Sequence, residues 1–266
     1  MISAIQNKQI KKIKLLQNKS KARKKQDAFV IEGIKMFEES RLDGNLIKSY
    51  FSKNFYENKY KEEPNYFKDL TYEIIEDGIF NKLSDTSTPQ GVLAVVKKPK
   101  YDIIDMIGDD NIALLSLENI QDPGNLGTMV RTAEAAGFTG IVLSSDCVDI
   151  FNPKVIRSTM GGIYRMPFVY VDNFKETLVE IKRKNIIIYA SHLESKNYYD
   201  EITYPRRCAI LIGNESTGLS NDTIKIADIL VKIPMQGKTE SLNAGVAASI
   251  MMYEVFRGLR SNLKTL

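Results

Sequence analysis

The chain has 266 residues, of which 43% are hydrophobic and 26% are charged, as is typical of a globular protein with a sizeable core. It contains no apolar run long enough to span a membrane and no signal-peptide pattern at its N-terminus, so we expect a cytoplasmic protein. Cys147 and Cys208 are expected to be free, buried thiols rather than a disulfide. Because His192 is the single histidine, no metal site is expected.

Positive charge is concentrated at the start of the chain. The formal net charge is +4, but residues 1–100 carry 20 Lys and Arg against 13 Asp and Glu, whereas residues 101–266 carry 17 against 20. A basic segment from Lys8 to Lys25 contains no acidic residue and is suited to contact phosphate. The alternative is a solvated basic helix without a partner. Within this segment, Lys21, Arg23, Lys24 and Lys25 are the residues predicted to contact phosphate.

The first hundred residues alternate helix and strand patterns. Helices are predicted over 3–17, where apolar residues share one face, and over 33–43, which is followed by Gly44. Short β-type runs predict strands over 28–31, 46–51, 72–75 and 91–96. These elements predict a small α/β domain over 1–100. The polar segment 97–102, which contains Pro99, is the best linker candidate.

Beyond the linker, apolar β-type runs alternate with helical stretches. Strands are predicted over 112–117, 140–143, 168–171, 186–190, 208–212 and 229–233, and helices over 124–137, 173–184 and 241–260. Continuous apolar strands separated by helices are typical of a parallel sheet that is covered on both faces. We therefore predict a second domain over 108–266 that is built on an open α/β sheet.

Ligands bind to such sheets at the loops that follow the strands. The segment NIQDPGNLGTMVRTAEAAG, residues 119–137, follows the first strand of the second domain. Residues 122–125 have turn-forming composition, Gly127 begins the next helix, and Arg131 lies about one turn further along, near Asn125. An arginine and an asparagine near a helix N-terminus can hold a phosphate or a ribose oxygen. The alternative is a simple connector with a surface arginine.

Two later segments also carry polar residues at strand ends. LIGNESTGLS, residues 211–220, places Glu215 after a buried strand, and Gly213 permits a close backbone approach to a ligand. In IPMQGKTESLNAGVAASIMMYEVFR, residues 233–257, the loop 234–237 can surround an adenine, and residues 241–243 precede a helix rich in small residues. Taken singly, these residues can equally be turn, cap and packing residues.

Together, the three segments resemble the three signature motifs of the SpoU/TrmH family of RNA methyltransferases, within the SPOUT superfamily. The matching patterns are N-x-x-D-P-x-N-x-G-x-x-x-R at 119–131, L-I-G-N-E-x-x-G-L at 211–219 and I-P-M-x-G-x-x-x-S-L-N-A at 233–244. The order and the spacing agree with the family, which makes the signal specific. Residues 1–100 resemble the L30e-like substrate-binding domain of the family members that modify ribosomal RNA, so Lys21, Arg23, Lys24 and Lys25 are the predicted RNA-binding residues.

The resemblance implies an S-adenosylmethionine-dependent RNA 2′-O-ribose methyltransferase. It implies that the last part of the chain forms a deep trefoil knot and that two chains form a homodimer through their knotted domains. The implied cofactor-binding residues are Ala190, Gly213, Asn214, Ile233, Met235, Gln236, Leu242 and Ala244, and the implied catalytic residues are Arg131, Asn125, Glu215, Ser241 and Asn243. Arg131 is expected near the target phosphate and 2′-hydroxyl, as an orienting group or a phosphate-assisted base, from either subunit. No metal is implied.

The architecture favours 23S ribosomal RNA as the substrate. The alternatives are a transfer RNA 2′-O-methyltransferase and an RNA- or ribosome-binding protein without catalysis. SPOUT enzymes that methylate a base atom rank lower, because they generally carry other motif residues. Thiostrepton-resistance methyltransferases share the architecture, so an antibiotic-resistance role is also open. His192 is expected near the mouth of the cofactor site rather than in catalysis. Tyr198 and Tyr199 are expected to pack within their loop, and the alternative is that they stack on a base.

Overall fold

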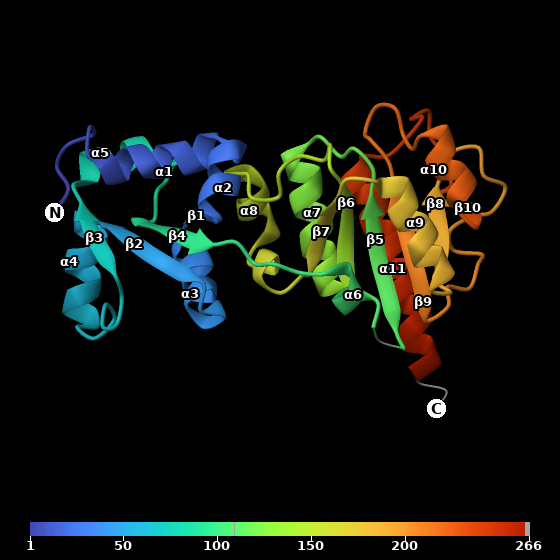
Figure 1. Ribbon diagram of the computed structural model, residues 1–266, viewed down its shortest axis with the longest axis horizontal. Helices are drawn as coiled ribbons and strands as arrows, with labels where there is room; N and C mark the ends of the chain where they lie inside the picture. Colours follow the sequence, from blue (N-terminus) through green and yellow to red (C-terminus); the bar gives the residue numbers. More distant parts are fainter. Residues whose placement is uncertain (109, 264–266) are drawn as a thin grey trace. The chain divides into compact units, whose positions relative to one another are not determined.

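The computed structural model describes residues 1–108 and 110–263, without the side chains of 261–263. The chain forms two compact units (Figure 1). The first comprises residues 1–100 and 149–164, and the second comprises the described residues of 101–148 and 165–266. The sequence-based division into 1–100 and 108–266 did not include this return of the chain to the first unit. Its second range also covers residues 109 and 264–266, which lie outside the described residues.

The first unit is built on a mixed four-stranded sheet. Its elements are α1 (Lys8–Asn18), α2 (Ser20–Gln26), β1 (Ala28–Glu32), α3 (Ile34–Asp43), β2 (Leu46–Ser52), α4 (Lys53–Glu62), β3 (Tyr72–Ile75), α5 (Asp77–Leu83), β4 (Val92–Lys97), α8 (Pro153–Thr159) and η1 (Gly162–Tyr164). The strand order is β1-β4-β2-β3, in which β4 pairs antiparallel with β1 and β2, and β3 pairs parallel with β2. The four predicted strands are confirmed, whereas α4 and α5 were not predicted.

Helices cover both faces of this sheet (Figure 1). Ile10, Ile13 and Leu16 of α1 pack with α5 and with alternate strand residues in one buried cluster. The other face holds a cluster of aromatic rings from α3, β2, α4 and the loop before β3. Within it, the Phe37 and Phe51 ring centroids are 5.5 Å apart. Because successive residues of a strand point to opposite faces, Tyr50 and Phe51 serve different faces.

Residues 149–164 are held in the first unit by a buried arginine. Arg23 is 3% exposed as a residue. Its guanidinium lies 2.7 Å from the Asp149 carboxylate and donates hydrogen bonds of 2.7 and 2.9 Å to the carbonyls of Leu16 and Gln17. This contradicts the prediction that Arg23 binds RNA, because its donors are already used inside the protein. Lys21, Lys24 and Lys25 are exposed, and their role in RNA binding stays a prediction.

The second unit contains a six-stranded parallel sheet. Its elements are α6 (Ile103–Met106), β5 (Ile112–Leu117), α7 (Pro123–Ala135), β6 (Gly140–Ser144), β7 (Phe168–Val171), α9 (Phe174–Arg183), β8 (Ile187–Ser191), β9 (Arg207–Ile212), α10 (Asn221–Ile226), β10 (Ile229–Val231) and α11 (Ala244–Leu263). The order is β10-β8-β9-β5-β6-β7, and every pair is parallel. The predicted fold class, an α/β protein with a parallel sheet after a small α/β domain, is confirmed. The trefoil knot stays a prediction from the family resemblance.

The register of this sheet brings the ends of four strands together. Leu117 of β5 pairs with Ile212 of β9, and Ser191 of β8 pairs with Val231 of β10. The loops after these strands therefore meet at one edge of the sheet. Helices α7 and α11 pack against each other, whereas α9 packs against α10. Cys147 and Cys208 are buried and free, as expected. Within the described residues, no helix is both long and apolar enough to cross a membrane.

Candidate functional site

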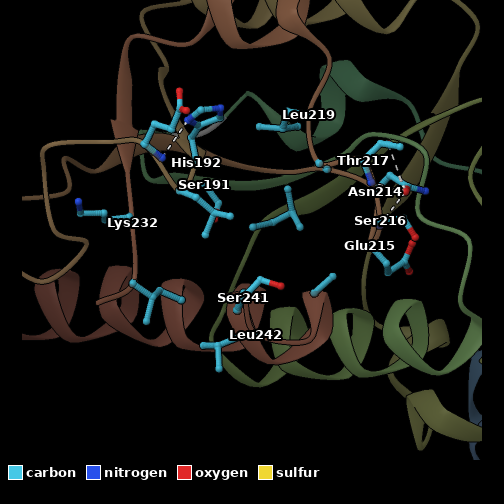
Figure 2. A pocket seen from close by; sticks show the side chains of 18 of the residues that line it. Ser191, His192, Asn214, Glu215, Ser216, Thr217, Leu219, Lys232, Ser241 and Leu242 are labelled. Atoms are coloured by element: carbon cyan, nitrogen blue, oxygen red, sulfur yellow. Dashed lines mark hydrogen bonds between the residues drawn. The ribbon is translucent and has the colours of Figure 1, made fainter. Parts of the chain in front are cut away.

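A cavity of about 460 Å³ lies at this edge of the sheet. Its walls come from four loops, within residues 191–194, 212–219, 232–235 and 241–247. Figure 2 shows Ser191, His192 and Lys232 on one side of the cavity and the loop that carries Asn214 and Glu215 on the other. Its volume falls in the range of small-molecule and cofactor sites in proteins, about 300–1,000 Å³.

Most of the predicted cofactor-binding residues line this cavity. Those that do are Gly213, Asn214, Ile233, Met235, Leu242 and Ala244. The other two do not. Ala190 is fully buried in the apolar cluster beneath the sheet, one residue before Ser191, which does line the cavity. Gln236 follows Met235 and is exposed. The contact of all eight residues with a cofactor stays a prediction.

Gly213 is required by the loop's own backbone. A Cβ atom at this position would lie 2.3 Å from the carbonyl carbon of Gly218 and from the nitrogen of Leu219. Asn214 and Gly218 exchange two backbone hydrogen bonds, of 3.1 and 2.9 Å, which close the loop at this crossing. The close approach predicted for Gly213 is therefore an approach of the chain to itself, and the folded loop forms the cavity wall.

The Asn214 side chain also has a structural role. Its Nδ2 donates a 2.8 Å hydrogen bond to the carbonyl of Asn119, and its Oδ1 accepts bonds of 2.9 and 3.1 Å from the backbone nitrogens of Ser216 and Thr217. It thereby joins the loop after β9 to the loop after β5. Although Asn214 lines the cavity, these bonds explain why an asparagine stands there without invoking a ligand.

Glu118, the residue after β5, holds the far end of the same loop, and the sequence analysis missed it. Its carboxylate accepts hydrogen bonds of 2.9 Å from the Ser220 nitrogen, 2.8 Å from the Ser220 hydroxyl and 2.8 Å from the Thr223 hydroxyl. Ser220 caps α10 at the same time. The available signal was an acidic residue directly after a buried strand, in the position that precedes the first motif.

Three predicted catalytic residues form one hydrogen-bonded chain. The Asn125 side chain donates a 3.0 Å bond to the Glu215 carboxylate and accepts a 2.8 Å bond from the Asn243 side chain. Asn243 Oδ1 also accepts from the nitrogen of Val246 in the first turn of α11. Asn243 therefore caps the N-terminus of α11. This cap explains why α11 begins at Ala244, whereas the sequence analysis predicted a start at residue 241. These hydrogen bonds join one residue from each of the three motifs.

Glu215 is held as an anion. Besides Asn125, its carboxylate accepts hydrogen bonds of 3.1 and 3.0 Å from the backbone nitrogens of Gln121 and Asp122, just before α7. Burial raises the pKa of Glu215, but the hydrogen bonds from Asn125, Asp122 and Gln121 outweigh it and lower the pKa below the ordinary value. A carboxylate with a lowered pKa is a poor proton acceptor near neutral pH, so Glu215 is suited to anchoring rather than to base catalysis.

Arg131 lies apart from this chain of residues. Asn125 is buried, whereas Arg131, six residues further along α7, is exposed. In the described part of the molecule the Arg131 guanidinium makes no hydrogen bond or salt bridge. Ser241 is also exposed, and it lines the cavity. The structure therefore brings Asn125, Glu215 and Asn243 together, places Ser241 at the cavity and leaves Arg131 available to another molecule.

Two further side chains at the cavity carry charge or can acquire it. His192 lines the cavity, as expected for a residue at its mouth. Lys232 is a lining residue too, but its ammonium points away from the centre of the cavity (Figure 2) and lies 5.3 Å from the ring centroid of Tyr198. Lys232 precedes the third motif directly and was not singled out from the sequence. Among the described residues, no group of three or more His, Cys, Asp or Glu side chains is placed to hold a metal ion.

Two protein-family models match the chain. Residues 113–253 match the SpoU rRNA Methylase family, and residues 7–94 match the MRM3-like substrate binding domain. The first match contains all the cavity-lining segments and all three motifs. The second covers the whole basic segment from Lys8 to Lys25 and most of the four-stranded sheet. The family matches thus follow the order of domains that the sequence predicts.

Individual relatives agree with these matches. The chain is 32% identical to the 23S rRNA (guanosine(2553)-2′-O)-methyltransferase RlmP of Bacillus subtilis, over 96% of this chain and 98% of the relative. The structure is similar to that of an AdoMet-bound rRNA methyltransferase from Sinorhizobium meliloti, with a TM-score of 0.84 and 26% identity over 97% of each chain. It is also similar to a crystal structure of an RNA 2′-O ribose methyltransferase, with a TM-score of 0.83 and 28% identity over 97% of this chain and 99% of the other.

These similarities span nearly the whole length of the chain and of its relatives. They confirm the predicted enzyme class, an S-adenosylmethionine-dependent RNA ribose 2′-O-methyltransferase. The chain belongs to the SpoU rRNA Methylase family.

Proposed function

We propose that this protein methylates the ribose 2′-hydroxyl of a nucleotide in 23S ribosomal RNA. The observation that carries the proposal is the hydrogen-bonded chain Glu215–Asn125–Asn243, which joins the three motifs beside a cavity of cofactor size. The choice of 23S ribosomal RNA is supported by the name of the Bacillus subtilis relative and by the substrate-binding domain match. The predicted cytoplasmic location stays a prediction.

The chemistry of the cavity fits S-adenosylmethionine. Apolar side chains of Ile212, Leu219 and Leu242 line it and would contact the adenine ring. Lys232 lies at the edge of the same cavity, and a turn of its flexible side chain toward the cavity would let its ammonium attract the carboxylate of the methionine part. When bound there, the donor supplies an electrophilic methyl group on a positively charged sulfur. Transfer of the methyl group from this sulfur requires no metal. Orientation and proton transfer therefore have to come from the residues and the substrate groups around the donor.

The residues around the cavity supply the orientation, and the phosphate held beside the target ribose would accept the proton that the 2′-hydroxyl loses as the O–C bond forms and the C–S bond breaks. The anchored Glu215 fixes the start of α7, the helix that carries Arg131. The exposed Arg131 guanidinium is free to hold the phosphate beside the target ribose and so to orient the 2′-hydroxyl. A hydroxyl held in line with the methyl group reacts faster, because the cost of bringing the groups together has already been met by binding.

We also propose that the active form is a homodimer. Helix α11 carries two large apolar side chains that are exposed in the single chain, Val246 at 46% and Tyr253 at 49%. A second copy packed on this helix would cover both and would place another Arg131 near the cavity. Sedimentation equilibrium tests the proposal. A monomer at the concentrations used in the methylation assay would contradict it, and Tyr253→Glu should shift a dimer toward monomer.

The decisive experiment is methyl transfer to RNA that lacks the modification. Ribosomal RNA from cells without the gene is incubated with the protein and isotope-labelled S-adenosylmethionine, then digested and analysed by mass spectrometry. The expected product is one 2′-O-methylated nucleoside from 23S RNA. Transfer only to transfer RNA would contradict the choice of substrate, and transfer to a base atom would contradict the reaction. RNA binding without transfer would favour the non-catalytic alternative.

A further inference from the structure

A second cavity, of about 380 Å³, lies in the first unit. Its walls come from the start of α3, the end of β2, helix α4, Tyr66 in the loop before β3, and the loop 89–91. It is therefore on the side of the sheet that carries α3 and α4, whereas α1 and α5 cover the other side (Figure 1). This second cavity shares no lining residue with the cavity proposed to bind S-adenosylmethionine. The proposed methyl transfer therefore gives it no role.

The lining combines aromatic rings with amide and carboxylate groups. Phe55 and Tyr66 supply the rings, and their centroids are 6.3 Å apart in an edge-on arrangement. Asn58, Glu62 and Gln90 supply polar groups around them. Asn58 and Glu62 are exposed on helix α4, whereas Phe55 of the same helix is half-buried against Phe51. In the part of the chain that the structure describes, the Glu62 carboxylate makes no hydrogen bond or salt bridge.

The cavity is formed before any ligand binds. Gly91 has a φ of +78°, and a Cβ atom there would lie 2.6 Å from both the Phe55 Cβ and the Ser52 hydroxyl. The loop 89–91 can therefore approach α4 only with glycine at this position. The Gln90 side-chain oxygen accepts a 2.9 Å hydrogen bond from the nitrogen of Ile34, at the first turn of α3. These contacts fix the loop against both helices.

We propose that this cavity binds one unpaired base of the RNA substrate, with guanine preferred. Single-stranded RNA is commonly recognised through unstacked bases that lie against aromatic side chains and form hydrogen bonds along their edges. Phe55 and Tyr66 provide the first kind of contact, and Asn58, Glu62 and Gln90 the second. A guanine edge carries two neighbouring N–H donors, which match the Glu62 carboxylate, whose oxygens accept no hydrogen bond from the described residues. The proposal rests on the proposed function only in taking RNA as the substrate.

The charges of the cavity favour a base over a phosphate. The carboxylates of Glu38 and Glu62 both line it. The one lysine in the lining, Lys59, is 2.6 Å from the Glu63 carboxylate and 4.8 Å from the Tyr66 ring centroid, so its charge is already compensated. A phosphate would meet carboxylates without a free cation beside them. The exposed lysines of α1 and α2 are better placed for phosphates, on other elements of the same unit.

This division of labour predicts a distinctive salt dependence. Contacts with phosphates release counterions, so their loss changes the slope of affinity against salt, whereas loss of a base contact lowers affinity by the same factor at every salt concentration. The experiment measures binding of the full-length protein to two labelled single-stranded RNAs of about twelve nucleotides, oligo(U) and oligo(U) with one central guanine, at several salt concentrations.

The wild type should bind the guanine-containing RNA about tenfold more tightly than oligo(U). Glu62→Gln should abolish most of this preference and leave the salt slope unchanged. Tyr66→Leu should weaken binding of both RNAs about tenfold through loss of the ring, whereas Tyr66→Phe should keep wild-type affinity. Lys61→Ala is the matched control, since Lys61 is on α4 but does not line the cavity. It should keep the guanine preference.

Two results would overturn the proposal: no guanine preference in the wild type, or the same preference in Glu62→Gln as in the wild type. Thermal unfolding of each variant identifies any effect that comes from misfolding, and Glu62→Gln carries the test if Tyr66→Leu does not fold. The proposed methylation is judged separately, from transfer by the wild type to ribosomal RNA. Transfer without a guanine preference removes only the base-binding proposal, and a preference without transfer removes only the proposed reaction.

Discussion

The carboxylate of Glu215 accepts a 3.0 Å hydrogen bond from the side chain of Asn125, although ninety residues separate them in the sequence. Glu215 follows β9 and Asn125 lies in the first turn of α7, after β5. Because β5 and β9 are adjacent parallel strands, the segments that follow them begin at the same edge of the sheet, where Asn125 and Glu215 meet. This hydrogen bond joins a wall of the cavity to the helix that carries Arg131.

Glu215→Gln should lower the free energy of unfolding by about 1–2 kcal/mol, measured by urea denaturation. Glutamine has one acceptor oxygen, and its NH2 group would face the backbone N–H donors of Gln121 or Asp122. Glu194→Gln is a matched control, because Glu194 lines the same cavity and its carboxylate makes no hydrogen bond within the described residues. Equal stability of the two variants would show that the Glu215 contacts contribute little.

The contribution of Glu215 should depend on pH in a definite direction. Its pKa is lowered in the folded protein, so its stabilising effect is complete above the ordinary value of about 4.5 and is lost as the pH falls through the folded-state pKa. The difference in unfolding free energy between wild type and Glu215→Gln should be constant from pH 7 to about pH 5 and should shrink below it. A difference that grows on acidification would contradict the assigned direction.

Arg131→Ala should reduce methyl transfer by at least about a hundredfold and leave donor affinity and melting temperature unchanged. The guanidinium is exposed and has no partner among the described residues, so its removal disturbs nothing within the chain. Single-turnover kinetics and isothermal titration with S-adenosylmethionine separate the two effects. Arg131→Lys keeps the charge but not the two-pronged geometry, and it should fall between wild type and alanine. A loss of donor affinity would contradict the assigned role.

Arg23→Ala should destabilise the protein by about 3 kcal/mol, because it leaves Asp149 and two backbone carbonyls without their buried partner. Lys24→Ala, on the same helix, is the control, because Lys24 is exposed. It should change stability by less than about 0.5 kcal/mol and should reduce the salt dependence of RNA binding. Thermal unfolding and binding titrations check both expectations. A stable Arg23→Ala variant with weakened RNA binding would restore the original prediction for Arg23.

Glu118→Gln should weaken donor binding about fivefold, as expected for the loss of one hydrogen bond of roughly 1 kcal/mol. The substitution keeps one acceptor for the hydroxyls of Ser220 and Thr223 but removes the acceptor for the Ser220 nitrogen. The loop 213–220 then loses one of its fixed ends. Isothermal titration measures the change. Unaltered donor affinity would mean that the crossing at Gly213 holds the loop without Glu118.

The strands and the ligand-binding edge were predictable because their signals are local. Each run of apolar β-type residues in the second domain forms a strand, and in a parallel sheet the loops after neighbouring strands must meet. Helices α4 and α10 were not predicted. No residue of α4 is fully buried, and α10 has only six residues, so neither helix leaves a clear apolar pattern in the sequence.

The type of a residue did not predict which other residues of the chain it contacts. Arg23 stands in a run of basic residues and resembles its neighbours in sequence, yet Asp149 pairs with it from a distant segment. Gly213 was correctly singled out, but its neighbour is the backbone of Gly218 and Leu219. In both positions, the residue that explains the choice of side chain is brought close only by the tertiary fold.

The return of residues 149–164 to the first unit has a consequence for dissecting the protein. The chain passes between the units after Lys100, after Val148 and after Tyr164, so one cut in the linker would not yield two complete fragments. A fragment of residues 1–100 would expose the Arg23 guanidinium and the Phe29 ring, which pack on Asp149 and Phe151. A faithful isolated first unit therefore needs residues 149–164 fused to residues 1–100 through a designed connection.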